Sequence, residues 1–479
     1  MNCRARSAAV LVVGMLVGWG CSQPPAAPKT AQPAASPDAR LAGSYRFDRD
    51  GWIFVHLEGS PATLGYQHGY LLAAETADLL RVFRAFSEHQ TKKDWAFFRT
   101  SAEQILWPKM DAEYQQEIDG IVAGLHAKQI AADRWDIVAL NAIEELPDYY
   151  VPWLEKQQGK KPTQKAPGNC SAFVATGSYT KDGKIVIAHN AWTNYVTGAR
   201  WQIVFDLKPE KGYAVLMDGL PGVIVSDDDF GINSNGIMVT ETTITGFELF
   251  DPNGVPEFMR ARKALQYAGS IDDYVRIMLD GNNGAYANDW LVGDNKTGEI
   301  ARFELGLKEH SVERTKDGYF VGSNFPVGEK LIRNETTFDR KKKDSSPNAR
   351  RARWEQLMAQ YKGKIDVELA RQFEGDKFDV IEKKDGPTER SLCGLVDTSP
   401  RGVPEWNWPP YFPAGTVQSK VTDGTLAQSM QMWAAMGHQC APDFKAEAYL
   451  LQHPEHGWAR GLLRDMPTGP WALFTAGGR

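Results

Sequence analysis

The segment GNCSAFVATGSYTKDGKIVIAHNAWTNY, residues 168–195, decides the fold expected for this chain. Its runs CSAFVAT and KIVIAHN are rich in β-branched and aromatic residues, and they flank the turn sequence KDG at 181–183. Such runs around a tight turn predict two paired strands. The preceding residues 155–169 are polar and contain Gly and Pro, which predicts an exposed loop. Cys170 is therefore expected at the first residue of a strand, directly after a loop.

Further strand-like runs follow this segment, bounded by Gly, Asp and Asn: WQIVFDL, YAVLMDG, GIMVTETT, NDWLVGD, EIARFEL and YFVGSNF. Helices are predicted near 257–280, 348–361 and 422–437 from their hydrophobic spacing. The N-terminal part, 41–169, is expected to be mostly helical after a short β entry at 42–60. Consecutive strands with separate helices, without βαβ alternation, predict an α+β fold of antiparallel sheets covered by helices.

The first 40 residues have the pattern of an export segment and a tether. Residues 1–20 place two arginines before an apolar stretch that is too short to span a bilayer, which predicts a signal peptide. The end of this stretch resembles a bacterial lipoprotein box with Cys21 as the acylated residue, although Gly18 stands where Leu is usual. Lipidation at Cys21 and simple secretion are therefore both open. Residues 21–40 are rich in Pro and Ala, as in an extended tether. We expect an exported, membrane-anchored protein that faces the periplasm or the cell exterior.

The charge and the absence of common motifs exclude several classes of function. A formal net charge of -6 and a pI near 5.9 give no general attraction to nucleic acid. The sequence contains no G-x-S-x-G elbow, Walker loop, G-x-G-x-x-G, H-E-x-x-H or C-x-x-C motif. His453 and His456 in HPEHGW have no obvious third metal ligand and are expected in a surface loop. We therefore predict no cofactor and no metal.

The five cysteines divide into two groups. Cys3 and Cys21 fall in the export segment, which leaves three in the folded part. An odd number outside the cytoplasm suggests one pair and one remaining thiol. We favour a Cys393–Cys440 disulfide with Cys170 as a reduced, reactive thiol. Three reduced, buried cysteines are the alternative.

Cleavage of the Asn169–Cys170 bond would place a new α-amino group beside the Cys170 sulfur. An α-amine has a pKa of about 7.7 to 8.0 and a thiol a pKa of about 8.5, so the amine can accept the thiol proton at neutral pH. The nucleophile and its base then belong to one residue. The alternative is that Cys170 is only a small core residue at the start of a strand.

CSAF followed by HNAWTNY resembles the phospholipase B-like family, a branch of the N-terminal-nucleophile hydrolases related to penicillin V acylases, bile salt hydrolases and acid ceramidase. Further matching segments are PGVIVSDDDFGINSNGIMVTETT at 221–243, AYANDWLVGD at 285–294, GSNFP at 322–326 and GTVQSKVTD at 415–423. The resemblance covers nearly everything after the tether and is weakest in the helical N-terminal third.

The resemblance implies an αββα sandwich and self-cleavage before Cys170. It divides the chain into an N-terminal piece, 41–169, and a catalytic piece, 170–479. Acyl bonds would be hydrolysed through an acyl-enzyme on Cys170. His189 falls where related acylases carry an arginine, and Trp192 takes the place of their aspartate. Both departures match the phospholipase B-like branch.

Three more site residues are implied by the same resemblance. Asn324, in SNFP, matches an Asn whose amide contributes to an oxyanion hole, and Thr243 lies near the second contributor. Arg350, in NARRARW, aligns with a late arginine of the site, although the neighbouring arginines leave its register open.

The expected function is hydrolysis of acyl ester or amide bonds of lipids. One alternative is hydrolysis or acyl transfer on N-acyl amides, as in penicillin acylases. Another is a non-catalytic tethered lipoprotein. Esters and amides undergo the same attack, so the sequence does not separate these substrates.

Overall fold

The computed structural model describes residues 38–162, 170–226 and 230–478. Predictions for the signal peptide, for Cys21 and for Asn169 therefore lie outside the described residues. No helix in the described ranges is both long and apolar enough to cross a membrane.

Within the described residues, nine strands form a large sheet in the order β1-β2-β5-β6-β7-β8-β9-β10-β11. Their bounds are β1 Tyr45–Arg49, β2 Trp52–Gly59, β5 Ile203–Pro209, β6 Val215–Gly219, β7 Phe230–Asn233, β8 Ile237–Thr243, β9 Asn288–Asp294, β10 Glu299–Leu305 and β11 His310–Thr315. Neighbours run antiparallel except β2 and β5, which run parallel. Because β2 precedes the predicted cleavage point and β5 follows it, both pieces of the chain share one sheet.

A smaller antiparallel sheet has the order β12-β3-β4-β15-β16-β17 in the described part of the chain. These strands are β3 Ser171–Thr176, β4 Val186–Asn194, β12 Gly318–Gly322, β15 Ala414–Asp423, β16 Gln431–Met436 and β17 Ala472–Thr475. The pairing of β3 with β4, expected from the sequence, aligns Ala172 with His189. This register brings the middle of β4 beside the start of β3.

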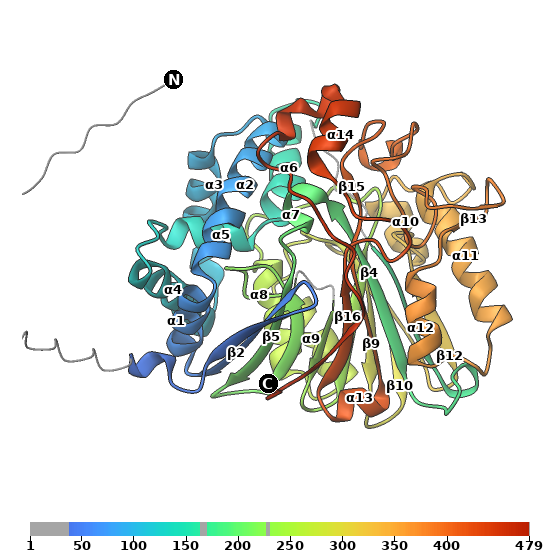
Figure 1. Ribbon diagram of the computed structural model, residues 1–479, viewed down its shortest axis with the longest axis horizontal. Coiled ribbons are helices and arrows are strands. Elements are labelled where there is room, and N and C mark those ends of the chain that lie inside the picture. The colour runs from blue at the N-terminus through green and yellow to red at the C-terminus, as the bar shows by residue number, and fades with distance from the viewer. Residues whose placement is uncertain (1–37, 163–169, 227–229, 479) are drawn as a thin grey trace, which may run out of the picture. The chain divides into compact units, whose positions relative to one another are not determined.

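The two sheets pack face to face between two layers of helices (Figure 1). Alternate residues such as Val174 and Ile187 of the small sheet meet Phe54 and Leu216 of the large sheet in one apolar cluster. The other face of the large sheet is covered by α1 Pro61–Leu71, α2 Ala73–Thr91, α4 Ala112–Ala127, α5 Arg134–Asn141, α8 Glu257–Tyr267 and α9 Ile271–Leu279. Helices α11 Ser346–Gln360 and α12 Val367–Glu374 cover the other face of the small sheet. The predicted α+β fold and its αββα layer order are confirmed.

One predicted helix was wrong. Residues 422–437 form the five-residue helix α13, Gly424–Gln428, followed by strand β16. Met432 and Ala434 alternate into the core between the sheets, and Trp433 pairs with Val421 of β15. The alternation of a strand therefore prevails over the helical spacing.

Cys393 and Cys440 form the disulfide predicted from the sequence, with their Cα atoms 6.0 Å apart. This bond joins the loop before β15 to the loop after β16. The carbonyl of Leu392, next to the bridge, accepts a hydrogen bond from the Trp192 indole at 3.1 Å. The disulfide therefore anchors the loop that holds Trp192.

Candidate functional site

Cys170 lies at the residue before β3 and is 1% exposed. Cys170 lies two residues before Ala172, whose side chain faces the large sheet. Side chains two residues apart along a strand point to the same face, so the thiol is expected on this inner face. The φ angle of Cys170 is 84°, in a region that non-glycine residues rarely adopt. Such a conformation costs on the order of 1–3 kcal/mol. Backbone strain is therefore present at the residue that follows the predicted scissile bond.

Arg350 of α11 approaches Cys170 from the opposite, helix-covered face of the small sheet. Its Nη1 donates to the Cys170 carbonyl at 2.5 Å and to the Ser171 hydroxyl at 3.0 Å, and its Nε donates to Ser346 Oγ at 3.1 Å. Of the arginines in NARRARW, Arg350 is fully buried, whereas Arg351 pairs with Glu355 near the surface. The structure thus settles which arginine points to Cys170.

Among the described residues, Arg350 donates four hydrogen bonds, all to neutral acceptors; the fourth acceptor is Asn324 Oδ1 at 2.7 Å. Burial lowers the pKa of Arg350 to about 9, and negative charge at Cys170 and at Glu405 counteracts this shift. The guanidinium therefore stays charged at neutral pH. A buried cation held by neutral groups is suited to stabilise negative charge that develops beside it.

The rings of Trp192 and Trp406 pack against the Arg350 guanidinium. The guanidinium carbon of Arg350 lies 4.7 Å from the Trp192 ring centroid and 5.5 Å from that of Trp406. Cation–π contacts of this kind contribute about 1–2 kcal/mol when desolvated. Trp192 thus acts on Arg350, where the related acylases have an aspartate.

Asn324 connects the two sheets at the same end of the sandwich. Its Oδ1 accepts from Arg350, and its Nδ2 donates to the Thr243 carbonyl at 2.9 Å. A carbonyl accepts hydrogen bonds, so this contact positions Asn324 and does not itself form part of an oxyanion hole. The buried Thr243 hydroxyl as an oxyanion donor stays a prediction.

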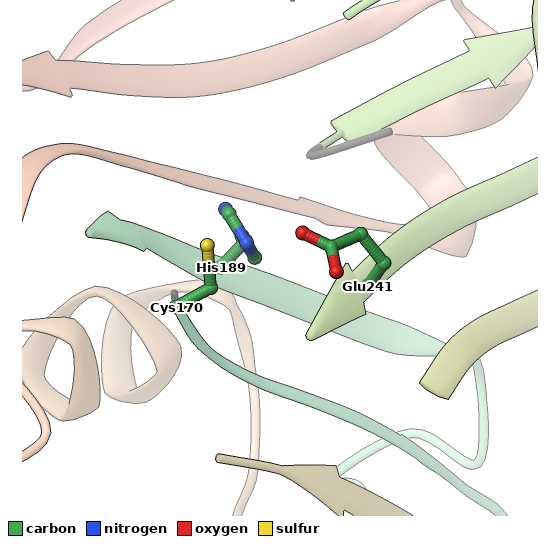
Figure 2. A group of neighbouring side chains, drawn as sticks. All are labelled: Cys170, His189 and Glu241. Carbon is green, nitrogen blue, oxygen red and sulfur yellow. The ribbon is translucent and has the colours of Figure 1, made fainter. Parts of the chain in front are cut away.

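His189 lies beside the thiol on the inner face of β4. One ligand atom each from Cys170, His189 and Glu241 lie within 4.8 Å of one another, and Figure 2 shows the His189 ring between the sulfur and the carboxylate in this view. Burial is the largest cause of a pKa of His189 well below its usual value, and the positive charge of Lys420 is the second. His189 is therefore neutral at physiological pH.

Lys420 is paired with His189 in the β4–β15 register, and its Nζ lies 3.0 Å from Asp218 Oδ2 of β6. Thiolate, imidazole and carboxylate are metal-ligand types. However, the buried positive charge of Lys420 beside His189 disfavours a second cation there. The Cys170–His189 pair is therefore better suited to proton transfer than to metal binding.

Glu241 was missed by sequence reasoning. It is fully buried near the end of β8, where Tyr286 donates to its Oε1 at 3.3 Å. The available signal was a single acidic residue within the strand-like run GIMVTETT. Strand patterns alone do not show that this residue meets β3 and β4 of the other sheet.

A cavity of about 300 Å³ adjoins the site at Trp406, whose ring packs on Arg350, and Thr193 also lines it, whereas Cys170 and His189 do not. Part of its lining is aromatic, formed by Phe83, Phe86, Trp406, Trp408, Phe412 and Trp458. The rest is largely polar and includes the charged residues Lys92, Glu144 and Asp148. His456 was expected in a surface loop, but it is buried and lines this cavity. Its ring hydrogen-bonds the Pro410 carbonyl at 3.1 Å, which holds it inside. The volume of this cavity is within the range of small-molecule binding sites.

The structure shows two stacked sheets between helical layers, with Cys170 directly before strand β3 of the smaller sheet, which is the arrangement that the sequence resemblance implies. A family model described as Phospholipase B matches residues 72–302. Cys170, His189, Trp192, Glu241 and Thr243 lie in that range. The chain is therefore related to the phospholipase B-like proteins.

Individual relatives are distant. The chain is 25% identical to putative phospholipase B-like 1 of Caenorhabditis elegans over 355 residues, 62% of this chain and 61% of that protein. It is 31% identical to putative phospholipase B-like 2 of Bos taurus over 145 residues, 27% of this chain and 24% of that protein. The matches thus span less than two thirds of these relatives. A mutant conjugated bile acid hydrolase from Clostridium perfringens is 14% identical, with a TM-score of 0.34 over 56% of this chain and 89% of that one.

The contacts of Arg350 lead to a stability prediction. Arg350→Met removes the donor to the buried Cys170 carbonyl, to Ser171 and to Asn324, and should lower the free energy of unfolding by about 3 kcal/mol. Arg351→Met, on the outer side of the same helix, is the matched control and should change it by less than about 0.5 kcal/mol. Denaturant titrations of both variants measure the difference. Equal effects would show that the buried hydrogen bonds contribute nothing specific.

Proposed function

We propose that this chain is a hydrolase of acyl ester or amide bonds, with Cys170 as an N-terminal nucleophile after cleavage of the Asn169–Cys170 bond. The arrangement around Cys170 carries the proposal: its thiol lies beside neutral His189, and its carbonyl is held by the buried charge of Arg350. A core cysteine with no chemical role would not require a buried cation at its own main chain.

In the mature protein the α-amine of Cys170 accepts the thiol proton, and the sulfur attacks the acyl carbonyl of the substrate. The tetrahedral intermediate collapses to a thioester and releases the alcohol or amine. Water then hydrolyses the thioester and regenerates the thiol. Arg350 stabilises the negative charge of the intermediates through its own charge, and Asn324 holds the guanidinium in place. Asn324 adds an amide donor if its Nδ2 turns from the Thr243 carbonyl to the substrate oxygen. Removing one such donor typically slows a reaction by about 100- to 1000-fold.

The aromatic cavity supports a fatty acyl group as the part of the substrate that is recognised. Each buried methylene contributes about 0.8 kcal/mol, so the aromatic part of the cavity favours longer acyl chains over acetyl groups. The names of the relatives point in the same direction, to phospholipids. Lipidation of exported protein at Cys21 would keep the enzyme beside such substrates. Acyl transfer to an amine differs only in the group that resolves the thioester.

The role of Cys170 predicts a graded effect of its replacement. Cys170→Ala should stay a single chain without activity, because the thioester cannot form. Cys170→Ser should cleave slowly through its weaker hydroxyl nucleophile. Electrophoresis under denaturing conditions, combined with assays of fatty acid release from phospholipids and N-acyl amino acids, measures both steps. Release by Cys170→Ala equal to that by the wild type would favour the non-catalytic lipoprotein.

The cavity predicts chain-length selectivity. Trp408→Ala should raise KM about tenfold for an octanoyl ester, through lost apolar contact, and change KM for the acetyl ester less than twofold. Trp471→Ala is the matched control, because this partly buried tryptophan packs on the far side of the small sheet. Steady-state kinetics on both esters give the comparison. Equal changes for both esters, or the same selectivity loss in Trp471→Ala, would place the acyl group elsewhere.

A further inference from the structure

Self-cleavage poses a proton-transfer problem that the mature mechanism does not solve. In the uncut chain the nitrogen of Cys170 belongs to a peptide bond, whose lone pair is delocalised into the carbonyl. This nitrogen therefore cannot accept the thiol proton. The base that serves turnover in the proposed function does not exist until cleavage is complete, so the precursor needs another one.

His189 has the geometry for this role. The backbone of Glu241 hydrogen-bonds the ring and favours its protonated form, as a carbonyl acceptor does. When one ring nitrogen of a neutral imidazole donates its proton, the other carries the lone pair. The thiol of Cys170 lies on the same inner face, within 4.8 Å of a ring nitrogen. Side-chain rotation or a tightening of the site brings such a pair into hydrogen-bonding distance, as is common when an enzyme reaches its reactive state.

We propose that His189 is the proton shuttle of self-cleavage and that the α-amine of Cys170 takes over as the base once cleavage has produced it. His189 accepts the proton of the Cys170 thiol, and the sulfur forms a bond with the carbonyl carbon of Asn169. The carbon–nitrogen bond breaks, and His189 returns the proton to the nitrogen of Cys170. Water hydrolyses the thioester, which leaves a carboxylate on Asn169 and the thiol on Cys170.

The charged groups around His189 favour a ring that is protonated only briefly over a permanent thiolate–imidazolium pair. Groups that face this region are the thiol on β3, Glu241 on β8 and Lys420 on β15, with Asp218 of β6 bound to Lys420 and Arg350 of α11 behind the Cys170 carbonyl. An imidazolium beside Lys420 is short-lived, so it gives its proton readily to the departing nitrogen. Glu241 holds the ring in place and is a positioning residue.

The test separates cleavage from turnover in His189→Gln. Newly synthesised precursor is followed by pulse–chase electrophoresis, and acyl ester turnover is measured per cut chain. Cleavage should slow at least about 100-fold, the contribution expected of a general base. Turnover per cut chain should fall no more than tenfold. His438→Gln is the matched control, since this buried histidine also hydrogen-bonds a backbone carbonyl, that of Thr416 at 2.7 Å.

A pH profile of the wild type gives a second readout that does not depend on folding of a variant. Turnover should fall about 60-fold from pH 7.5 to 5.5, as an amine with a pKa of about 7.7 becomes protonated. Cleavage should fall less steeply than turnover over the same range, because burial lowers the pKa of His189 and keeps the ring neutral further into the acid range than the α-amine. The shuttle would be overturned if cleavage and turnover had parallel pH profiles, or if His189→Gln were cleaved at the wild-type rate. Slowing of cleavage in His438→Gln as large as that in His189→Gln would also overturn it. A wild type that is never cut would instead overturn the proposed function.

Discussion

Arg350 carries a positive charge into the interior, where its hydrogen bonds end on the Cys170 carbonyl, Ser171, Ser346 and Asn324. Those contacts join α11, the start of β3 and the end of β12, and through Asn324 they extend to β8 of the other sheet. Desolvating such a charge is costly, and here neutral acceptors and two tryptophan rings offset the cost without neutralising the charge. The same guanidinium therefore positions the thiol, links the two sheets and can stabilise an anion.

A cut between Asn169 and Cys170 is compatible with this sandwich. Strand β2, from the N-terminal piece, lies in the large sheet next to β5 of the catalytic piece, and its apolar residues belong to the clusters on both faces of that sheet. The N-terminal helices cover the same sheet. Cleavage therefore removes one covalent bond at a strained residue while the shared hydrogen bonds and core remain. This explains how a new terminus can form inside a folded protein without loss of the fold.

The α+β class, the β3–β4 pairing and the Cys393–Cys440 disulfide could be predicted from strand patterns, a turn and the number of cysteines, whereas the αββα layer order came from the family resemblance. The helix predicted at 422–437 was wrong, since pairing with β15 decides the conformation of β16. Glu241 and Lys420 could not be found, because their relevance arises from contacts between strands that are distant in sequence. The family resemblance placed Thr243 near the second contributor to the oxyanion hole, and the structure shows its carbonyl accepting from Asn324 Nδ2.

The central claim is that Cys170 is both the new N-terminus and the residue that carries the acyl group. Trypsin cuts after Lys165 and Lys181, so an uncut chain yields a peptide of residues 166–181, and the proposed mature chain yields residues 170–181. Enzyme quenched with acid during turnover of a fatty acyl ester should give the shorter peptide, with the acyl mass on Cys170 when analysed by mass spectrometry. Fully active protein that yields only the unmodified peptide of residues 166–181 would contradict the account.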